Sequence, residues 1–167
     1  MPPVSQRLLE SLKQHGANFF VTVPCKLSAD LVLLISQDKG IIHVAPTREE
    51  EGVGICAGAY LSGKTPVMVI QNSGIGNSAN ALVSLTQLYQ IPLLLLCTHR
   101  GSPGERIGAQ VPMGIAVKGL LDAIDIPYFS YNNPSQTEQV GGLVDYAQVA
   151  QRPVAALLGF DFWREGV

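Results

Sequence analysis

Three adjacent glutamates precede a long uncharged stretch of the chain. Glu49, Glu50 and Glu51 follow Thr47 and Arg48, and the next charged residue is Lys64. A positioned carboxylate can act as a general acid or base. It can also stabilise the positive end of a helix dipole. The spacing Thr47-x-x-Glu50 is that of a capping box, so local sequence alone favours the capping interpretation and leaves catalysis as the alternative.

A polar, glycine-containing segment, residues 71–77, follows the apolar run 67–70. With Ala79 it matches the G-x-G-x-x-G/A pattern of dinucleotide-binding loops. However, the preceding strand is the third of the chain rather than the first, and the next strand ends without the acidic residue that would hold a ribose. Two interpretations therefore stay open: a loop that binds the phosphates of NADP, and a tight turn capped by Asn77.

Four cationic side chains are candidates for binding an anion. Lys26 follows a predicted strand directly, and His99, Arg100 and Arg106 follow another. Such groups bind carboxylates, sulfonates or phosphates through charge-assisted hydrogen bonds. The alternative is that they are simply solvated, as polar residues in loops usually are.

The hydrophobic pattern predicts alternating strands and helices. Apolar, β-rich runs predict strands at 19–23, 41–44, 67–70, 93–97, 128–130 and 154–158. Helical periodicity and capping residues predict helices over 4–15, from 28 to 35, and over 47–60, 77–90, 114–124 and 134–151. This alternation predicts an α/β fold, a parallel sheet covered by helices on both faces.

Two features of this fold suggest where a site lies. Ligands of such sheets bind beyond the carboxyl ends of the strands, so the polar segments 24–26, 46–50, 71–77 and 98–110 should share one edge. The helix over 47–60 also contains three glycines, Gly52, Gly54 and Gly58. Each costs about 1 kcal/mol relative to alanine, which suggests that something packs very close to this helix.

The composition limits the possible functions. The 167 residues are 47% hydrophobic and only 14% charged, with a net charge of −2. We expect one domain, residues 1–167, with part of its surface covered by a partner protein. We expect neither nucleic acid nor a membrane as partner, because there is no basic field and no apolar run of spanning length. Three cysteines far apart in the sequence suggest reduced thiols in the cytoplasm.

The run from Glu50 to Tyr60 resembles the pyrimidine-binding (PYR) domain of thiamine-diphosphate-dependent 2-oxo acid decarboxylases. In that family a glutamate begins the helix, and small residues lead to a tyrosine. Residues 71–77 are similar to the matching loop of the phosphonopyruvate and sulfopyruvate decarboxylases. The resemblance covers nearly the whole chain. It implies a three-layer αβα fold, a sheet of strand order 2-1-3-4-6-5, and cofactor contacts from Glu50, Pro24, Gln71, Asn72, Ser73, Gly74 and Asn77.

The resemblance also implies a reaction. Glu50 would hydrogen-bond the ring nitrogen of the cofactor's aminopyrimidine and so deliver acid–base catalysis through the cofactor. The expected activity is decarboxylation of sulfopyruvate to sulfoacetaldehyde, a step toward coenzyme M, with phosphonopyruvate as the alternative substrate. An NADP-binding or regulatory module is the alternative of another class. The acidic substrate would meet Lys26, His99, Arg100 and Gln110.

One departure from the family pattern implies a second polypeptide. The family holds the diphosphate and Mg²⁺ with a Gly-Asp-Gly segment, and this sequence contains none. The resemblance therefore implies a partner, a beta subunit that carries the diphosphate- and Mg²⁺-binding domain, with no metal ligand in this chain.

Overall fold

The strands form one parallel sheet in the computed structural model, which describes residues 2–164. Within that range the sheet has six strands in the order β2-β1-β3-β4-β6-β5, as the resemblance implied. Their bounds are β1 Phe19–Thr22, β2 Ile42–Val44, β3 Pro66–Gln71, β4 Leu93–Thr98, β5 Tyr128–Tyr131 and β6 Pro153–Leu158. β3, β4 and β6 are almost entirely buried, because helices cover both faces of the sheet.

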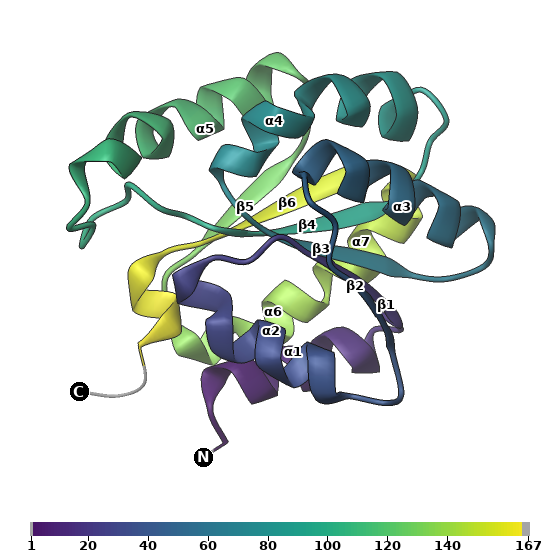
Figure 1. The fold of residues 1–167 in the computed structure, drawn as a ribbon, viewed down its shortest axis with the longest axis horizontal. Helices are drawn as coiled ribbons and strands as arrows, with labels where there is room; N and C mark the ends of the chain where they lie inside the picture. Colours follow the sequence, from purple (N-terminus) through teal and green to yellow (C-terminus); the bar gives the residue numbers. More distant parts are fainter. Residues whose placement is uncertain (1, 165–167) are drawn as a thin grey trace.

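The helices form two layers, one on each face (Figure 1). One layer contains α1 (Val4–Gln14), α2 (Ala29–Gln37), α6 (Thr137–Gly141) and α7 (Leu143–Ala150), and the other contains α3 (Glu49–Leu61), α4 (Ser73–Ala81) and α5 (Val111–Ala123). The predicted three-layer αβα architecture is therefore confirmed. Short helical turns complete the chain: η1 Lys26–Ser28, η2 Leu82–Gln87, η3 Gly108–Gln110, η4 Pro134–Gln136 and η5 Phe160–Trp163. No helix in residues 2–164 is both long and apolar enough to cross a membrane.

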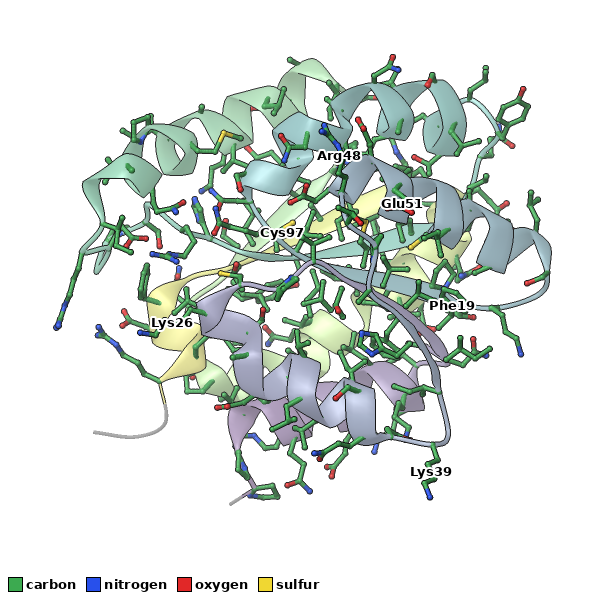
Figure 2. All side chains as sticks on the ribbon, in the orientation of Figure 1. Phe19, Lys26, Lys39, Arg48, Glu51 and Cys97 are labelled. Atoms are coloured by element: carbon green, nitrogen blue, oxygen red, sulfur yellow. The ribbon has the colours of Figure 1, made fainter. Side chains whose placement is uncertain are left out.

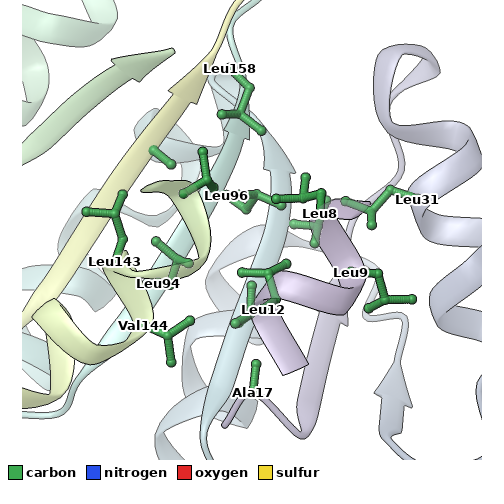
Figure 3. Close-up of a cluster of buried hydrophobic side chains, with 14 of the residues drawn as sticks. Leu8, Leu9, Leu12, Ala17, Leu31, Leu94, Leu96, Leu143, Val144 and Leu158 are labelled. Carbon is green, nitrogen blue, oxygen red and sulfur yellow. The ribbon is translucent and has the colours of Figure 1, made fainter. Parts of the chain in front are cut away.

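Each layer has its own hydrophobic core. Leu8, Leu12 and Leu31 of α1 and α2 pack with Leu94 and Leu96 of β4 on one face (Figure 3). On the other face, side chains of α3, α4 and α5 pack on the alternate residues of the same strands. Burying each of these side chains stabilises the fold by about 1.5–3 kcal/mol, so the two cores hold the sheet edge in place from both sides.

Three predicted helices have different bounds in the structure. The helix predicted over 77–90 begins at Ser73 and widens into the π-helical turn η2. Within it, Thr86 Oγ1 donates to the carbonyl of Leu82, a local bond that commonly bends helices. The helix predicted over 114–124 begins earlier, at Val111, and the one predicted over 134–151 is divided into η4, α6 and α7.

α1 and α6 approach each other closely at a glycine. A Cβ built at Gly141 would lie 2.0 Å from Ser11 Oγ and 3.0 Å from Ser11 Cβ. Ser11 Oγ donates to Glu138 across the same contact. The neighbouring Gly142 is open, since the nearest atom to a Cβ there would be 3.6 Å away.

We predict that Gly141→Ala destabilises the protein by about 1–3 kcal/mol, the usual penalty for overpacking, because Ser11 must move and its bond to Glu138 is lost. Gly142→Ala is the matched control. It should be neutral or stabilising by up to about 1 kcal/mol, since alanine is the better helix former. Urea unfolding of both variants measures the difference, and equal stabilities would contradict this account of the contact.

Candidate functional site

The start of α3 is built differently from the predicted capping box. The helix begins at Glu49, and its N-cap residue Arg48 makes no side-chain capping bond. The amide of Thr47 instead donates to Glu51 Oε2, at 3.0 Å. The Thr47–Glu50 capping box is therefore wrong. Successive helical residues are about 100° apart around the axis, and Glu51 rather than Glu50 is the one that faces back to Thr47.

Glu50 lies exposed at the surface of the described chain. Its Oε1 is 3.0 Å from Arg48 Nε, and the two side chains are 50% and 65% exposed. Ion pairs this exposed contribute little, commonly less than about 1 kcal/mol. The Glu50 carboxylate is therefore not needed by the fold and stays available to a ligand.

Glu49 connects the starts of α3 and α4. Its Oε2 accepts a hydrogen bond from Asn77 Nδ2 at 2.9 Å. Its Cγ would lie 2.6 Å from a Cβ at Gly74, so a larger residue there would displace the Glu49 side chain. Asn77 lies inside α4, and the N-cap position belongs to Asn72. The suggestion of a turn capped by Asn77 is therefore wrong.

The contact of Glu49 also bears on the dinucleotide interpretation. In dinucleotide-binding folds the pyrophosphate lies at the helix N-terminus, where amide groups and the helix dipole favour an anion. In this chain the Glu49 carboxylate already lies there, beside Gly74 and bonded to Asn77. Its negative charge would repel a pyrophosphate, so the geometry opposes an NADP site at this loop.

Gln71 joins three segments of the sheet edge. Its Nε2 donates to Ser73 Oγ at 2.7 Å and to Gln110 Oε1 at 2.9 Å. The thiol of Cys25 lies 3.7 Å from Gln71 Oε1. These contacts bring together the ends of β1 and β3 and the turn before α5, as the shared-edge argument predicted.

Asn72 holds the ends of β3 and β4 together. Its side chain is buried, with Nδ2 donating to the Arg100 carbonyl at 3.0 Å and Oδ1 accepting from the Arg100 amide at 3.1 Å. The side chain is thus occupied by the backbone of this chain. A direct contact of its amide with a cofactor stays a prediction that nothing in the structure tests.

Arg100 and Glu105 form a buried ion pair. Arg100 Nε and Nη2 donate to the two carboxylate oxygens at 2.7 and 2.9 Å, and the two side chains are only 10% and 3% exposed. Glu105 also accepts from the amides of Gly101, Arg106 and Ile107. The guanidinium, followed by these amides, holds the pKa of Glu105 well below its usual range. Nothing in the sequence spacing singled out Glu105, because its partners lie in an irregular loop.

The four cationic candidates differ in whether their side chains already have a partner in the structure. Arg100 is neutralised by Glu105 and lies 5.8 Å from the ring centre of Phe160. His99 Nε2 donates to the carbonyl of Gly114 at 3.0 Å. Lys26 and Arg106 are exposed and have no side-chain partner within residues 2–164.

Lys26 lines two cavities at the carboxyl edge of the sheet. One, of about 420 Å³, lies between Pro24, Cys25 and α2. The other, of about 410 Å³, lies between Lys26, Arg106 and the turn η5. Figure 2 shows Lys26 at this end of the molecule, while Pro24 is exposed beside it.

The glycines of α3 face in two directions. Gly52 packs against the sheet, since a Cβ there would lie 2.7 Å from Met68 Cε and 3.0 Å from Val21 Cγ1. Gly54 and Gly58 meet nothing within 4 Å. The predicted close packing is thus confirmed for Gly52 within this chain, and the other two glycines lie on open surface.

The three cysteines form no disulfide. Cys25, Cys56 and Cys97 are all buried free thiols, as predicted from their distance in the sequence. Among residues 2–164, no group of three or more His, Cys, Asp or Glu side chains is placed to hold a metal ion.

Similar proteins include archaeal enzyme subunits that match the chain from end to end. The sulfopyruvate decarboxylase subunit alpha of Methanocaldococcus jannaschii is 44% identical, over 95% of both chains. The protein of the same name from Methanococcus maripaludis is 40% identical, over 95% of this chain and 96% of its own. The phosphonopyruvate decarboxylase of Streptomyces viridochromogenes is 34% identical over 72% of this chain, which spans only 31% of that protein.

Solved structures confirm the fold. The thiamine diphosphate-dependent 4-hydroxybenzoylformate decarboxylase of Rhodococcus jostii RHA1 aligns over 96% of this chain with a TM-score of 0.74, at 15% identity, and the aligned part is 31% of that protein.

The family model described as "Thiamine pyrophosphate enzyme, N-terminal TPP binding domain" matches residues 3–123. Thiamine pyrophosphate is another name for thiamine diphosphate. This match and the relatives that align over 95% of the chain show that the chain belongs to the thiamine pyrophosphate enzyme family and corresponds to the N-terminal TPP binding domain of that family.

Proposed function

We propose that residues 1–167 are the single PYR domain of a heteromeric thiamine-diphosphate-dependent decarboxylase, which converts sulfopyruvate to sulfoacetaldehyde and CO₂. This reaction would serve coenzyme M biosynthesis. The observation that carries the proposal is the match of at least 40% identity, over about 95% of both chains, to alpha subunits of that name. The exposed carboxylate of Glu50 at the carboxyl edge of the sheet, paired only with the exposed Arg48, supports it.

Glu50 is the proposed catalytic residue. Thiamine diphosphate, when bound, supplies the electron sink for the electron pair left when CO₂ departs. The Glu50 carboxylate would hydrogen-bond the ring nitrogen of the aminopyrimidine and hold a proton there. The fit is supported by the exposure of Glu50 and its weak, screened pairing with Arg48. Breaking that pair would cost the protein little.

The remaining proposed cofactor contacts surround the starts of α3 and α4. Gln71 and Ser73 are linked by a hydrogen bond, and Gly74 and Asn77 contact Glu49. We propose that Pro24, Gln71, Asn72, Ser73, Gly74 and Asn77 form the pyrimidine side of the pocket, with the buried Asn72 acting by fixing the edge.

The diphosphate and Mg²⁺ would be held by a beta subunit. The absence of a Gly-Asp-Gly segment in the sequence supports this. The open surface at Gly54 and Gly58 of α3 also supports it, because glycines on a helix face let another backbone approach closely. Three free cysteines favour a reducing compartment, and we propose the cytoplasm.

Phosphonopyruvate is the second candidate substrate. A phosphonopyruvate decarboxylase is similar to the chain, although at 34% identity over a shorter span. Sulfonate and phosphonate are both tetrahedral anions with three terminal oxygens, so the same cationic side chains would suit either. The NADP-binding alternative has no such support, since Glu49 lies where its phosphates would bind.

We predict that the purified chain alone binds thiamine diphosphate weakly and decarboxylates nothing, because it lacks the diphosphate and Mg²⁺ ligands. Mixed with its beta subunit, it should become active in a Mg²⁺-dependent way. A coupled assay of aldehyde release measures this. Robust turnover by this chain without a second polypeptide would refute the proposal.

In the assembled enzyme, Glu50→Gln should lower kcat by about 10²–10⁴, the usual contribution of a positioned acid–base group. Thermal stability should barely change, because Glu50 makes only an exposed ion pair. Glu51→Gln is the matched control. It removes the neighbouring charge but keeps an oxygen that can accept from the Thr47 amide, so its activity should stay close to that of the wild type. Equal effects of the two substitutions would assign Glu50 a structural role.

Lys26→Met should raise KM for sulfopyruvate far more than KM for pyruvate, which lacks the acidic head group. A charge-assisted hydrogen bond contributes about 1.5–3 kcal/mol, which corresponds to a selectivity change of roughly 10–150-fold. Steady-state kinetics with both substrates measures it. Equal changes in the two KM values, or none, would mean that Lys26 is merely a solvated loop residue.

A further inference from the structure

One cavity at the carboxyl edge of the sheet is lined by cationic side chains from the segments that follow three different strands. Lys26 follows β1, Arg106 lies in the loop after β4, and Arg164 ends the turn that follows β6. The cavity has a volume of about 410 Å³. It is large enough for a short organic acid.

The charges in this cavity do not cancel. Arg100 also lines it, but Glu105, the carboxylate in its lining, forms a bidentate pair with Arg100. Arg164 is 3.1 Å from Asp161 in an exposed pair. After these pairs, Lys26 and Arg106 are left as two positive charges without a partner in residues 2–164.

Glu105 determines where Arg106 lies. Its carboxylate accepts the amides of both Arg106 and Ile107, while the buried guanidinium of Arg100 holds it in place. The loop is thus anchored one residue before Arg106, whose side chain itself has no partner within residues 2–164. This arrangement positions a cation in the lining of the cavity.

The cavity wall suits the rest of a small anionic molecule. Leu27, Ile107 and Phe160 contribute apolar surface. The indole Nε1 of Trp163 is buried without an acceptor within residues 2–164.

We propose that Lys26 and Arg106 together bind the sulfonate or phosphonate group of the substrate. The planar fork of an arginine contacts two oxygens of a tetrahedral anion, and a lysine acts as a point charge on the third. Arg106 is then a residue that determines specificity, and Arg100 belongs to the loop scaffold. The identity of the ligand rests on the proposed decarboxylase function, whereas the anion site itself rests on the cavity and its charges.

Kinetics of the assembled enzyme test this assignment. Arg106→Gln should raise KM for sulfopyruvate about 10-fold or more, with kcat changed less than about 3-fold and KM for pyruvate unchanged. Arg106→Lys should be intermediate, because it keeps the charge and loses the fork. Lys39→Gln is the control for loss of one surface charge; Lys39 is exposed and lies well away from Lys26 in Figure 2.

A sulfopyruvate KM in Arg106→Gln within 2-fold of the wild type would overturn the proposal. The same measurements with phosphonopyruvate distinguish the two head groups.

A second measurement does not depend on turnover. Saturation-transfer NMR of the assembled enzyme with ethanesulfonate and ethylphosphonate should show binding to the wild type and to Lys39→Gln, and much weaker binding to Arg106→Gln. If the wild-type enzyme decarboxylates neither acid yet binds these probes through Arg106, the proposed function fails and the anion site stands. If it decarboxylates them and Arg106→Gln binds the probes as well as the wild type, the anion site fails alone.

Discussion

The site depends on the close approach of α3 to the sheet at Gly52. Gly52 lies against Val21 of β1 and Met68 of β3, which are paired across the two strands. A side chain at this position would have to displace the end of Met68 or push the helix outward. Because the helix lies this close, its first turn, with Glu49 and Glu50, is held at the carboxyl edge where β1 and β3 end.

The three glutamates of that first turn have three different environments. Glu51 bonds back to the amide of Thr47, and Glu49 crosses to Asn77 of α4. Glu50 is left with only an exposed partner. Helical geometry explains this division, since residues about 100° apart face the preceding loop, the neighbouring helix and the open surface in turn. The carboxylate with the least structural role is the one proposed for catalysis.

The cations divide in a similar way. Arg100 is fixed by Glu105, and His99 by the carbonyl of Gly114, so both stabilise the loop after β4. A buried, fully paired charge is expensive to disturb. Arg106 in this loop and Lys26 after β1 are exposed and unpaired within residues 2–164, so a ligand could bind them without breaking an existing ion pair. The charges that stabilise this edge and the charges proposed to bind a ligand are thereby carried by different residues.

The sequence by itself determined the class of fold and the sheet edge at which the candidate site lies. Alternating apolar runs and periodic segments predicted the strands and helices, and the run from Glu50 to Tyr60, with the segment 71–77, indicated the family and the strand order. The fold class could be predicted because hydrophobic periodicity is a local property that reports burial directly. The edge of the sheet could be predicted because parallel strands place all their carboxyl ends at one edge. The family and the strand order came from the resemblance.

Only the tertiary structure decided which side chains are free. Thr47 pairs with Glu51 rather than Glu50, and Arg100 is neutralised while Arg106 is not. The sequence pattern alone does not distinguish Glu50 from Glu51, or Arg100 from Arg106. Their roles depend on the direction of each side chain around a helix axis and on the irregular loop that Glu105 anchors. Both are set by tertiary contacts, which no residue pattern records.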